Sequence, residues 1–378
     1  MGYTKKILSA IAMITVNSTA LAAPFTFDAR TLGMGGVSTA TANLATAAWA
    51  NPSMLTRQSV EDDFALLIGV GAFVRDNEDL IGDIEDFQDA NDRGDQNEMA
   101  NIATGIEGKV IAPEATVPIA LGIAFDSFSM AISVRADAIG GGTVTDISTT
   151  PAEAVDPAFN ILNVSGVLAT EYAVSFAKDY ELFERRVSIG VKPKIVDLQS
   201  FSFSEAILTI DAGLGDVNTQ DDKVDLGDFP TVDLGLAMDL SENWLLGLNI
   251  RNLVTDQFEV GAQTLNFDTE ARIGVAYHNN WVTVAMDYDL TENEPLLPGE
   301  DFSGLKTQNV NIGAEFSAGD YVHLRVGAAQ NLAGNISTGA KDTQYTVGIG
   351  FWLGFNLDVA VIVTENSAGG MLQTGFSF

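Results

Sequence analysis

The sequence predicts an all-β protein: a transmembrane antiparallel β-barrel of about fourteen strands, with an N-terminal plug segment in the lumen and a short helix in the first extracellular loop. Apolar and polar residues alternate with a period of two along much of the 378-residue chain, as they do in strands with two different faces. After the N-terminal leader, no window is apolar for long enough to form a transmembrane helix. A closed sheet is the other structure that pairs every backbone group inside a bilayer.

Residues 1–22 are predicted to be a cleaved secretory signal peptide. A basic pair precedes an apolar run from Ile7 to Val16, and the leader ends in the small residues Ala20-Leu21-Ala22. Cleavage is expected after Ala22, because Pro24 disfavours a cut one residue later. An amphipathic helix of the mature protein fits less well, since the polar residues 17–19 interrupt the apolar run. We therefore expect the protein to be exported.

The chain is strongly acidic, with a formal net charge of −32 that becomes −34 when the leader takes away Lys5 and Lys6. A nucleic-acid partner is not expected, because a phosphate backbone binds to basic surfaces. The sequence contains no cysteine, which excludes disulfides, cysteine-bound zinc and thiol redox chemistry.

The mature N-terminus, residues 23–61, lacks clear strand alternation and is expected to form a plug inside a barrel that spans residues 62–378. Its glycine-rich stretch is not a phosphate-binding loop, because no strand precedes it and no Lys-Ser or Lys-Thr follows it. Glycines allow one backbone to pass close to another, which suits packing against an inner wall. Arg30 can pair with an inward carboxylate. The predicted plug residues are Arg30, Gly33, Met34, Gly35, Gly36, Asn51 and Pro52.

Alternation is clearest in the neighbouring segments 267–277 and 282–290, where one face is apolar and the other carries charges. Charges are costly against lipid, so that second face should line a polar lumen. Inward arginines are expected to pair with inward carboxylates, because an isolated enclosed charge is costly. The arginines are Arg251, Arg272 and Arg325, and their candidate partners are Asp239, Asp268, Asp287 and Glu315. The same period predicts strands at 64–74, 116–125, 128–139, 164–177, 187–198, 231–240, 245–253, 309–317, 321–329, 344–352, 357–363 and 371–378.

The links between these strands alternate strictly between short and long. Outer-membrane barrels keep short turns in the periplasm and long loops outside, which places both chain ends on the periplasmic side. The short links lie near 126–127, 178–185, 241–243, 278–280, 318–320 and 353–356. The first long link, residues 75–115, contains Leu80, Ile81, Ile84 and Phe87 at helical spacing, which predicts a short amphipathic helix at the extracellular mouth.

The last residues, Gly375 to Phe378, alternate apolar with polar and end on an aromatic ring. Such an ending resembles the terminal-strand signal that barrel-assembly machinery recognises, and an ordinary last strand is the alternative. The candidate assembly signal is Phe376 and Phe378. The expected partners are therefore this machinery and outer-membrane lipid.

No enzyme active site, metal site or cofactor is expected. Hydrolytic serine or aspartate chemistry needs a histidine partner, and the chain has only His278 and His323, both beside predicted short turns. The calcium-loop pattern fails at 89–94, where Arg93 occupies a ligand position, and at 216–225, which lacks the central glycine. Loose binding of divalent cations by the acidic loops stays open.

Several short motifs resemble known outer-membrane proteins. Asp28-Ala29-Arg30, the run from Gly33 to Gly36 and Asn51-Pro52 resemble the N-terminal signature of FadL-type long-chain fatty-acid transporters and related barrels. Residues 62–64, the acidic stretch 83–89 and residues 311–315 are more similar to outer-membrane proteins named conjugal transfer protein TraF. The resemblance covers essentially the whole mature chain. It implies a fourteen-stranded FadL-like barrel with an N-terminal plug, in the outer membrane of a Gram-negative bacterium.

Two function classes remain open on this basis. A transporter would pass a hydrophobic small molecule along the plug, where Phe25, Phe27, Leu32 and Met34 offer an apolar groove, and release it laterally or into the periplasm. A structural or docking protein would use the acidic loops and the periplasmic rim in an envelope or conjugation assembly. The many inward charges count against a wholly apolar channel. Passive transport is the preferred interpretation, and fold transfers more safely than function.

Overall fold

The structure, a computed structural model, describes residues 28–57, 63–76, 78–209, 223–260, 263–294, 306–319, 321–333, 343–363 and 367–378. The predicted signal peptide and most of the segment 216–225 lie outside the described residues.

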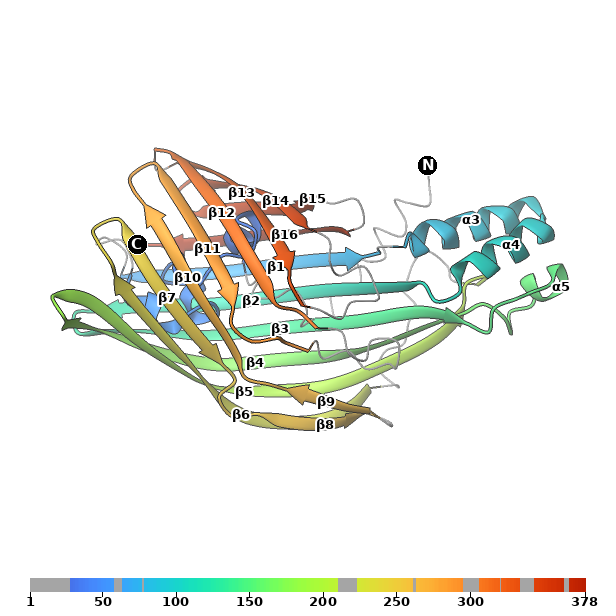
Figure 1. Cartoon of the computed structure of the whole chain (residues 1–378), viewed down its shortest axis with the longest axis horizontal. Coiled ribbons are helices and arrows are strands. Elements are labelled where there is room, and N and C mark those ends of the chain that lie inside the picture. The colour runs from blue at the N-terminus through green and yellow to red at the C-terminus, as the bar shows by residue number, and fades with distance from the viewer. Residues whose placement is uncertain are drawn as a thin grey trace.

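Fourteen antiparallel strands close into a barrel, in the order β1-β16-β15-β14-β13-β12-β11-β10-β7-β6-β5-β4-β3-β2 (Figure 1). The first strand pairs with the last, with Ala65 opposite Ser377, and with β2 on its other side. The predicted all-β barrel of about fourteen strands is therefore confirmed. The barrel strands are β1 (Phe64–Arg75), β2 (Val110–Phe125), β3 (Phe128–Thr145), β4 (Ile161–Leu182), β5 (Arg185–Ala206), β6 (Lys223–Asp239), β7 (Trp244–Arg251), β10 (Glu270–His278), β11 (Val282–Asp289), β12 (Asn309–Ala318), β13 (Val322–Asn331), β14 (Gln344–Trp352), β15 (Asn356–Val363) and β16 (Ser367–Ser377).

The outer face of the barrel is a broad apolar band. On β3, for example, Ile132 is 49% exposed, whereas its neighbour Ser133 points inward and is 3% exposed. A large continuous apolar surface is costly in water, so this band is the surface suited to contact with lipid hydrocarbon. Its exposed side chains include Ile68, Ile119, Ile132, Ile195, Leu236, Val284, Ile312, Leu324, Val347 and Leu372.

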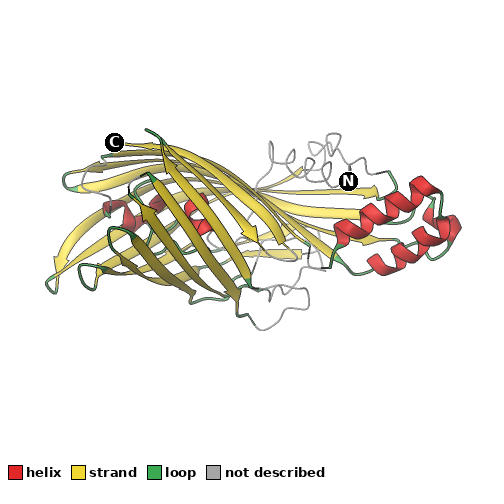
Figure 2. Ribbon diagram, turned by 90° about the horizontal axis from the view of Figure 1, so that it is seen from above, coloured by secondary structure: helices red, strands yellow, loops and turns green. Residues whose placement is uncertain are grey.

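One side of the barrel is much taller than the other. β4 and β5 contain 22 residues each, whereas β7 contains 8. The long strands continue past the short ones toward the helices (Figure 2). The sequence-based end of β5 at Leu198 was wrong, because its pairing with β6 continues through a register shift between Leu198 and Gln199, which breaks the simple alternation.

Three helices stand at the long-loop end: α3 (Leu80–Arg93), α4 (Gln96–Ile106) and α5 (Pro151–Ala154). The sequence predicted one short helix in the first long link, where the structure has α3 and α4. The second helix, α4, was not predicted because half of its buried face consists of alanines, Ala100 and Ala103.

The stretch 89–94, where the calcium-loop pattern fails, is helical for most of its length. Residues 89–93 form the end of α3, and Arg93 pairs with Glu98 at 2.7 Å. None of the described helices is long and apolar enough to cross a membrane.

A separate two-stranded sheet, β8 (Asp256–Val260) and β9 (Gln263–Phe267), lies in the link between β7 and β10. The sequence-based strand that began at Phe267 was wrong. The ring of Phe267 packs edge-on against Phe229, with centroids 4.7 Å apart, and β10 begins only at Glu270.

The C-terminal residue lies at the seam between the first and last strands. The Phe378 ring stacks on Phe64 with centroids 4.9 Å apart, and its backbone N donates to the Phe64 carbonyl oxygen at 3.0 Å. Phe376 is exposed on the outer face, and its ring centroid lies 6.1 Å from that of Phe355.

A tag inserted after Gly94, in the turn between α3 and α4, should be labelled on intact cells. A tag after Asn279, in the short turn between β10 and β11, should be labelled only once the outer membrane is permeabilised. The reason is that long links face outward in such barrels and short turns face the periplasm. Antibody labelling of whole and permeabilised cells measures this, and the reverse pattern would contradict the orientation.

Candidate functional site

A stretch of the N-terminal chain, residues 28–57, lies inside the barrel toward its short-turn end (Figure 1), and we call it the lumen segment. It contains α2 (Ala29–Gly33) and the short 3₁₀ helices η1 (Thr46–Ala48) and η2 (Pro52–Thr56). Asp28 caps α2 by accepting from the Thr31 backbone N at 2.9 Å, and Asn51 caps η2 by accepting from Ser53 at 3.2 Å. Burial raises the pKa of Asp28 above its ordinary value, although hydrogen bonds from Thr31 oppose this rise.

The lumen segment passes very close to the barrel wall at glycines of the wall. A Cβ on Gly327 of β13 would overlap the backbone of Met34 and Gly35. Gly35 itself has φ of 72°, which favours glycine, and a Cβ there would lie 2.6 Å from the Ala328 backbone N. Glycines of the lumen segment thus pack closely against glycines of the wall, such as Gly35 against Gly327. Other wall glycines whose Cβ would meet the segment are Gly122, Gly190, Gly235, Gly247, Gly274, Gly313 and Gly348.

Wall side chains also hydrogen-bond to the backbone of the lumen segment. Asp287 on β11 accepts from the backbone N of Ser38 at 2.8 Å and of Thr39 at 2.9 Å. Asn311 on β12 donates to the Gly35 carbonyl oxygen at 2.6 Å. Since a buried backbone group without a partner is costly, these bonds fix the path of the segment. Further anchors are Thr346 to Gly35, Gln373 to Ala29 and Asn249 to Ala50.

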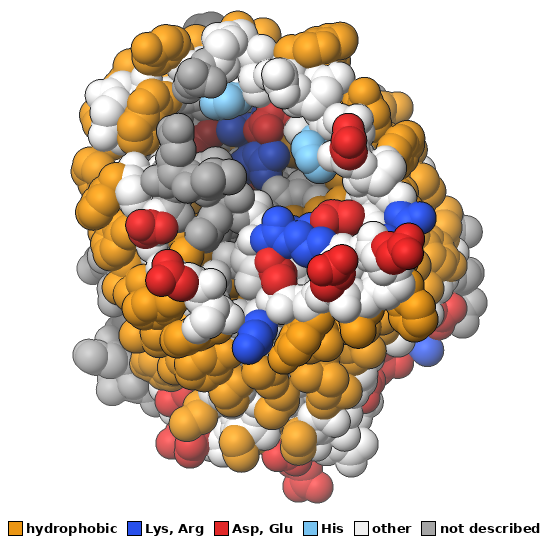
Figure 3. All heavy atoms as spheres, turned by 90° about the vertical axis from the view of Figure 1, so that its left-hand side faces the viewer, with side chains coloured by type: hydrophobic (Ala, Val, Ile, Leu, Met, Phe, Trp, Pro, Cys, Tyr) orange, Lys and Arg blue, Asp and Glu red, His pale blue; other side chains and the backbone are white. Residues whose placement is uncertain are grey.

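An ion-pair cluster at the short-turn end joins the lumen segment to β12, β13 and β15. Arg30 donates to both carboxylate oxygens of Glu315 at 2.8 Å, in the bidentate geometry that makes such pairs strong. Arg325 donates to Glu315 at 2.6 Å and to Asp358 at 2.5 Å. Burial opposes the charge on Arg30, but Glu315 together with Asp28 and Asp358 outweighs this effect and raises the pKa of Arg30. Figure 3 shows this end hollowed, with charged side chains inside and an apolar outer surface around them.

The far end of the lumen segment is held in a similar way. Arg57 pairs with Asp239 and donates from Nε to the Ser188 hydroxyl at 2.8 Å. Thr56 donates to Asp179 at 2.5 Å. The segment is thus attached by an arginine at each end, to different strands of the wall: Arg30 to β12 and Arg57 to β6.

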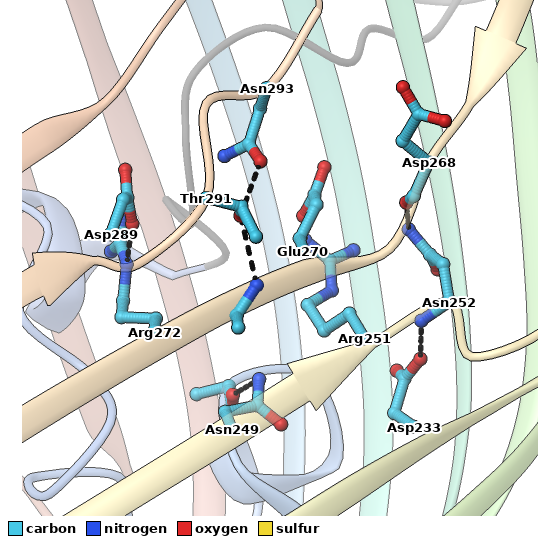
Figure 4. A network of polar contacts seen from close by, with 12 residues as sticks. Asp233, Asn249, Arg251, Asn252, Asp268, Glu270, Arg272, Asp289, Thr291 and Asn293 are labelled. Atoms are coloured by element: carbon cyan, nitrogen blue, oxygen red, sulfur yellow. Dashed lines mark hydrogen bonds and ion pairs between the residues drawn. The ribbon is translucent and has the colours of Figure 1, made fainter.

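Deeper in the lumen, a charged belt crosses the inner faces of β3 to β11. At its centre Lys194 Nζ lies 2.9 Å from an oxygen of Glu171 on β4 and 2.9 Å from an oxygen of Asp233 on β6. Lys192 contacts the same two carboxylates, and all four side chains are 5% exposed or less. Buried charges need such partners, because desolvation of an isolated ion is costly. The belt also includes the pairs Arg135–Asp137, Arg251–Glu270 and Arg272–Asp289 (the last two in Figure 4).

The three predicted inward arginines all lie buried in the lumen. Arg325 contacts Glu315, one of the carboxylates considered from the sequence, whereas Arg251 pairs with Glu270 at 3.0 Å and Arg272 with Asp289 at 2.5 Å. The remaining predicted plug residues, Gly33, Met34, Gly36, Asn51 and Pro52, are all buried within the lumen segment.

Asp268 was predicted to line the lumen, and this prediction was wrong. It is exposed in the turn between β9 and β10, where its backbone carbonyl oxygen accepts from Asn252 at 3.3 Å. Figure 4 shows its carboxylate pointing away from Arg251. The error follows from the strand boundary: alternation was counted from Phe267, which belongs to the β8–β9 sheet instead of the barrel wall.

Four residues at the centre of the belt were not predicted from the sequence: Glu171, Lys192, Lys194 and Asp233. The pattern Lys192-Pro193-Lys194 could have indicated a charged cluster in the lumen, because residues two positions apart on a strand share one face. Of the two histidines, His278 is exposed at a short turn and His323 Nδ1 lies 2.9 Å from the Ser317 hydroxyl.

Comparisons with known proteins agree with this architecture. The model of the family described as "F plasmid transfer operon, TraF, protein" matches residues 48–289. The Ralstonia pickettii toluene transporter TbuX aligns with a TM-score of 0.55 and 14% identity, over 94% of this chain and 99% of that one. The Pseudomonas putida toluene transporter TodX aligns with a TM-score of 0.55 and 12% identity over the same shares. The monoaromatic hydrocarbon channel CymD aligns with a TM-score of 0.51 and 13% identity, over 94% of this chain and 99% of that one. No curated protein matches the sequence.

The solved structures share the closed-barrel fold of this chain, which is the fold that the sequence motifs implied. At these low identities they establish the fold alone. They are transport channels by name, and their similarity spans nearly the whole of each chain.

Proposed function

Because this chain belongs to the family of the F plasmid transfer operon TraF protein, we propose that it acts as an outer-membrane channel for passive uptake or transfer of a hydrophobic small molecule. It resides in the outer membrane of a Gram-negative bacterium as an integral barrel, surrounded by outer-membrane lipid and inserted by the barrel-assembly machinery. It has no enzymatic activity and no nucleic-acid partner. The fold that it shares with toluene and monoaromatic hydrocarbon channels supports the proposal.

One observation carries the proposal: a closed barrel holds its own N-terminal chain in the lumen. The lumen segment is bound to the wall by ion pairs at Arg30 and Arg57 and by hydrogen bonds between them. A wide aqueous pore would need an empty lumen, so the segment acts as a plug that selects against bulk hydrophilic solutes. A molecule that crosses must either pass beside the plug or displace part of it.

Uptake by whole cells tests this function. Cells that express the protein should take up radiolabelled naphthalene faster than cells with an empty vector, because the channel bypasses the polar lipopolysaccharide layer. Uptake of a labelled disaccharide should stay unchanged, since the plug closes the aqueous route. Equal naphthalene uptake with and without the protein would contradict the proposal.

A docking role in an envelope or conjugation assembly is the second candidate. The helices α3, α4 and α5 share one apolar core with the ends of the long strands, in which Leu80, Phe87 and Met99 are fully buried and β3 contributes Val144. A helical cap that is packed onto the barrel in this way can serve as a recognition surface. Failure of the uptake experiment with a correctly assembled barrel would move this role ahead.

A further inference from the structure

An apolar patch faces the lumen just beyond the charged belt. Strand alternation places it on the inner wall: on β5, Val196 and Leu198 share the face of Lys192 and Lys194, and on β6, Phe229 shares the face of Asp233. The patch consists of Ile139, Val167, Ala169, Val196, Leu198 and Phe229, each 4% exposed or less.

The β8–β9 hairpin covers this patch with three apolar side chains, Phe258, Leu265 and Phe267. The Phe229 ring has its centroid 5.3 Å from that of Phe258 and 4.7 Å from that of Phe267, the latter in edge-to-face geometry. Both separations lie in the range of favourable aromatic pairs. Two rings of the hairpin thus occupy positions against Phe229 that suit aromatic groups.

The hairpin is a separate element and is not a strand of the barrel. Its two strands pair with each other in a sheet of their own. Its polar residues Gln257, Glu259 and Thr264 are exposed, so the sheet has one apolar face against the patch and one polar face away from it. An element attached chiefly through a few apolar side chains can separate from its support at lower cost than a strand that is paired on both sides.

The belt beneath the patch is already neutralised. Lys192 and Lys194 share the two carboxylates of Glu171 and Asp233, and Arg251 has Glu270. A bound anion would have to give up its water and compete with carboxylates that are already in place. A neutral apolar molecule meets no such cost and gains from leaving water.

We propose that the apolar patch is an internal binding site for a neutral aromatic hydrocarbon of one or two rings, and that the β8–β9 hairpin is its lid. On binding, the ligand ring takes the place of Phe258 and Phe267 against Phe229, and the hairpin swings away. The proposal rests on the proposed channel function, because it names the site that the transported molecule would occupy first.

The test measures binding of naphthalene to the full-length protein in lipid nanodiscs, with empty nanodiscs to subtract partitioning into lipid. The two kinds of variant should shift affinity in opposite directions. Phe229→Ala should weaken binding about tenfold, because it removes the aromatic surface under the ligand. The double variant Phe258→Ala and Phe267→Ala should strengthen binding several-fold, because it removes the side chains that compete for the site.

Matched controls keep the result interpretable. Gln257→Ala, on the exposed face of the hairpin, should bind naphthalene like the parent. Each variant is compared only after heat-modifiable mobility shows an intact barrel. Unchanged or weaker binding by the double lid variant would overturn the lid, and unchanged binding by Phe229→Ala would overturn the site.

A second arm compares naphthalene with 1-naphthoate, its anionic analogue at neutral pH. Naphthoate should bind at least about tenfold more weakly if the neutralised belt excludes anions. Equal or tighter binding of naphthoate would contradict the ligand class. If the purified protein binds naphthalene but cells show no uptake, the channel function is rejected and the site is kept. If cells take up naphthalene and none of these variants changes the uptake, the site is rejected and the channel function is kept.

Discussion

Removing residues 28–57 should turn a nearly closed barrel into an open pore with several-fold larger single-channel conductance in planar bilayers. The wall is a complete hydrogen-bonded cylinder without the lumen segment, so the barrel should still form. The deletion also removes Arg30 and Arg57 and leaves their partners Glu315 and Asp239 facing the pore. The open pore should therefore prefer cations, which the reversal potential in a salt gradient measures.

Point variants separate occlusion from the side effects of a large deletion. Gly327→Val places a branched side chain where the backbone of Met34 and Gly35 lies, so it should expel part of the segment and raise conductance strongly. Arg30→Ala should act in the same direction more weakly, since it removes one anchor. Val326→Ile, one residue away on the outer face, is the matched control. A folded deletion variant that conducts no better than the parent would reject the plug and favour the docking role.

Deleting Phe378 should sharply lower the amount of protein that reaches the outer membrane in heat-modifiable form. The residue is the candidate assembly signal, and its backbone carbonyl oxygen accepts from Asp63 and Phe64 at 2.9 Å where the last strand meets the first. Loss of the residue therefore removes both the terminal ring and part of the closing contact. Unheated gels of outer-membrane fractions measure the assembled form.

Phe378→Tyr keeps a terminal aromatic ring and the backbone contacts, so it should assemble like the parent. Phe376→Ala tests whether the penultimate ring contributes on its own. If the deletion variant inserts normally, either Phe376 is sufficient or the terminal ring is not an assembly signal.

Local sequence patterns were enough to predict the barrel because each spanning strand must present a different chemistry to each side. Beyond the apolar band the strands no longer face lipid, and there the predicted strand boundaries were inaccurate. Above the apolar band the outer face of β5 turns polar at Asp197 and Gln199, which interrupts the apolar face, although the strand itself continues to Ala206. The β8–β9 sheet was not predicted either, because it is not a strand pair of the lipid-facing wall. It forms a separate sheet that packs against the inner wall.

The candidate site was harder to predict, since it depends on which strands become neighbours. Inward arginines could be identified one strand at a time, but Arg272 meets Asp289 because β10 pairs with β11 in a particular register. The contact of Gly35 with Gly327 joins residues nearly three hundred positions apart in the sequence. No local spacing encodes such a contact.

The short strands on one side of the barrel have a consequence for the membrane itself. β7, β11 and β15 contain 8 residues each, fewer than the roughly 9–11 that a tilted strand needs to cross a typical hydrocarbon core. The lipid beside them must therefore thin, or the barrel must tilt toward that side, at a modest cost for each ångström of hydrophobic mismatch. Bacterial outer membranes are thinner than average, which lowers this cost. Bilayer thickness thus helps to decide in which membrane this barrel is most stable.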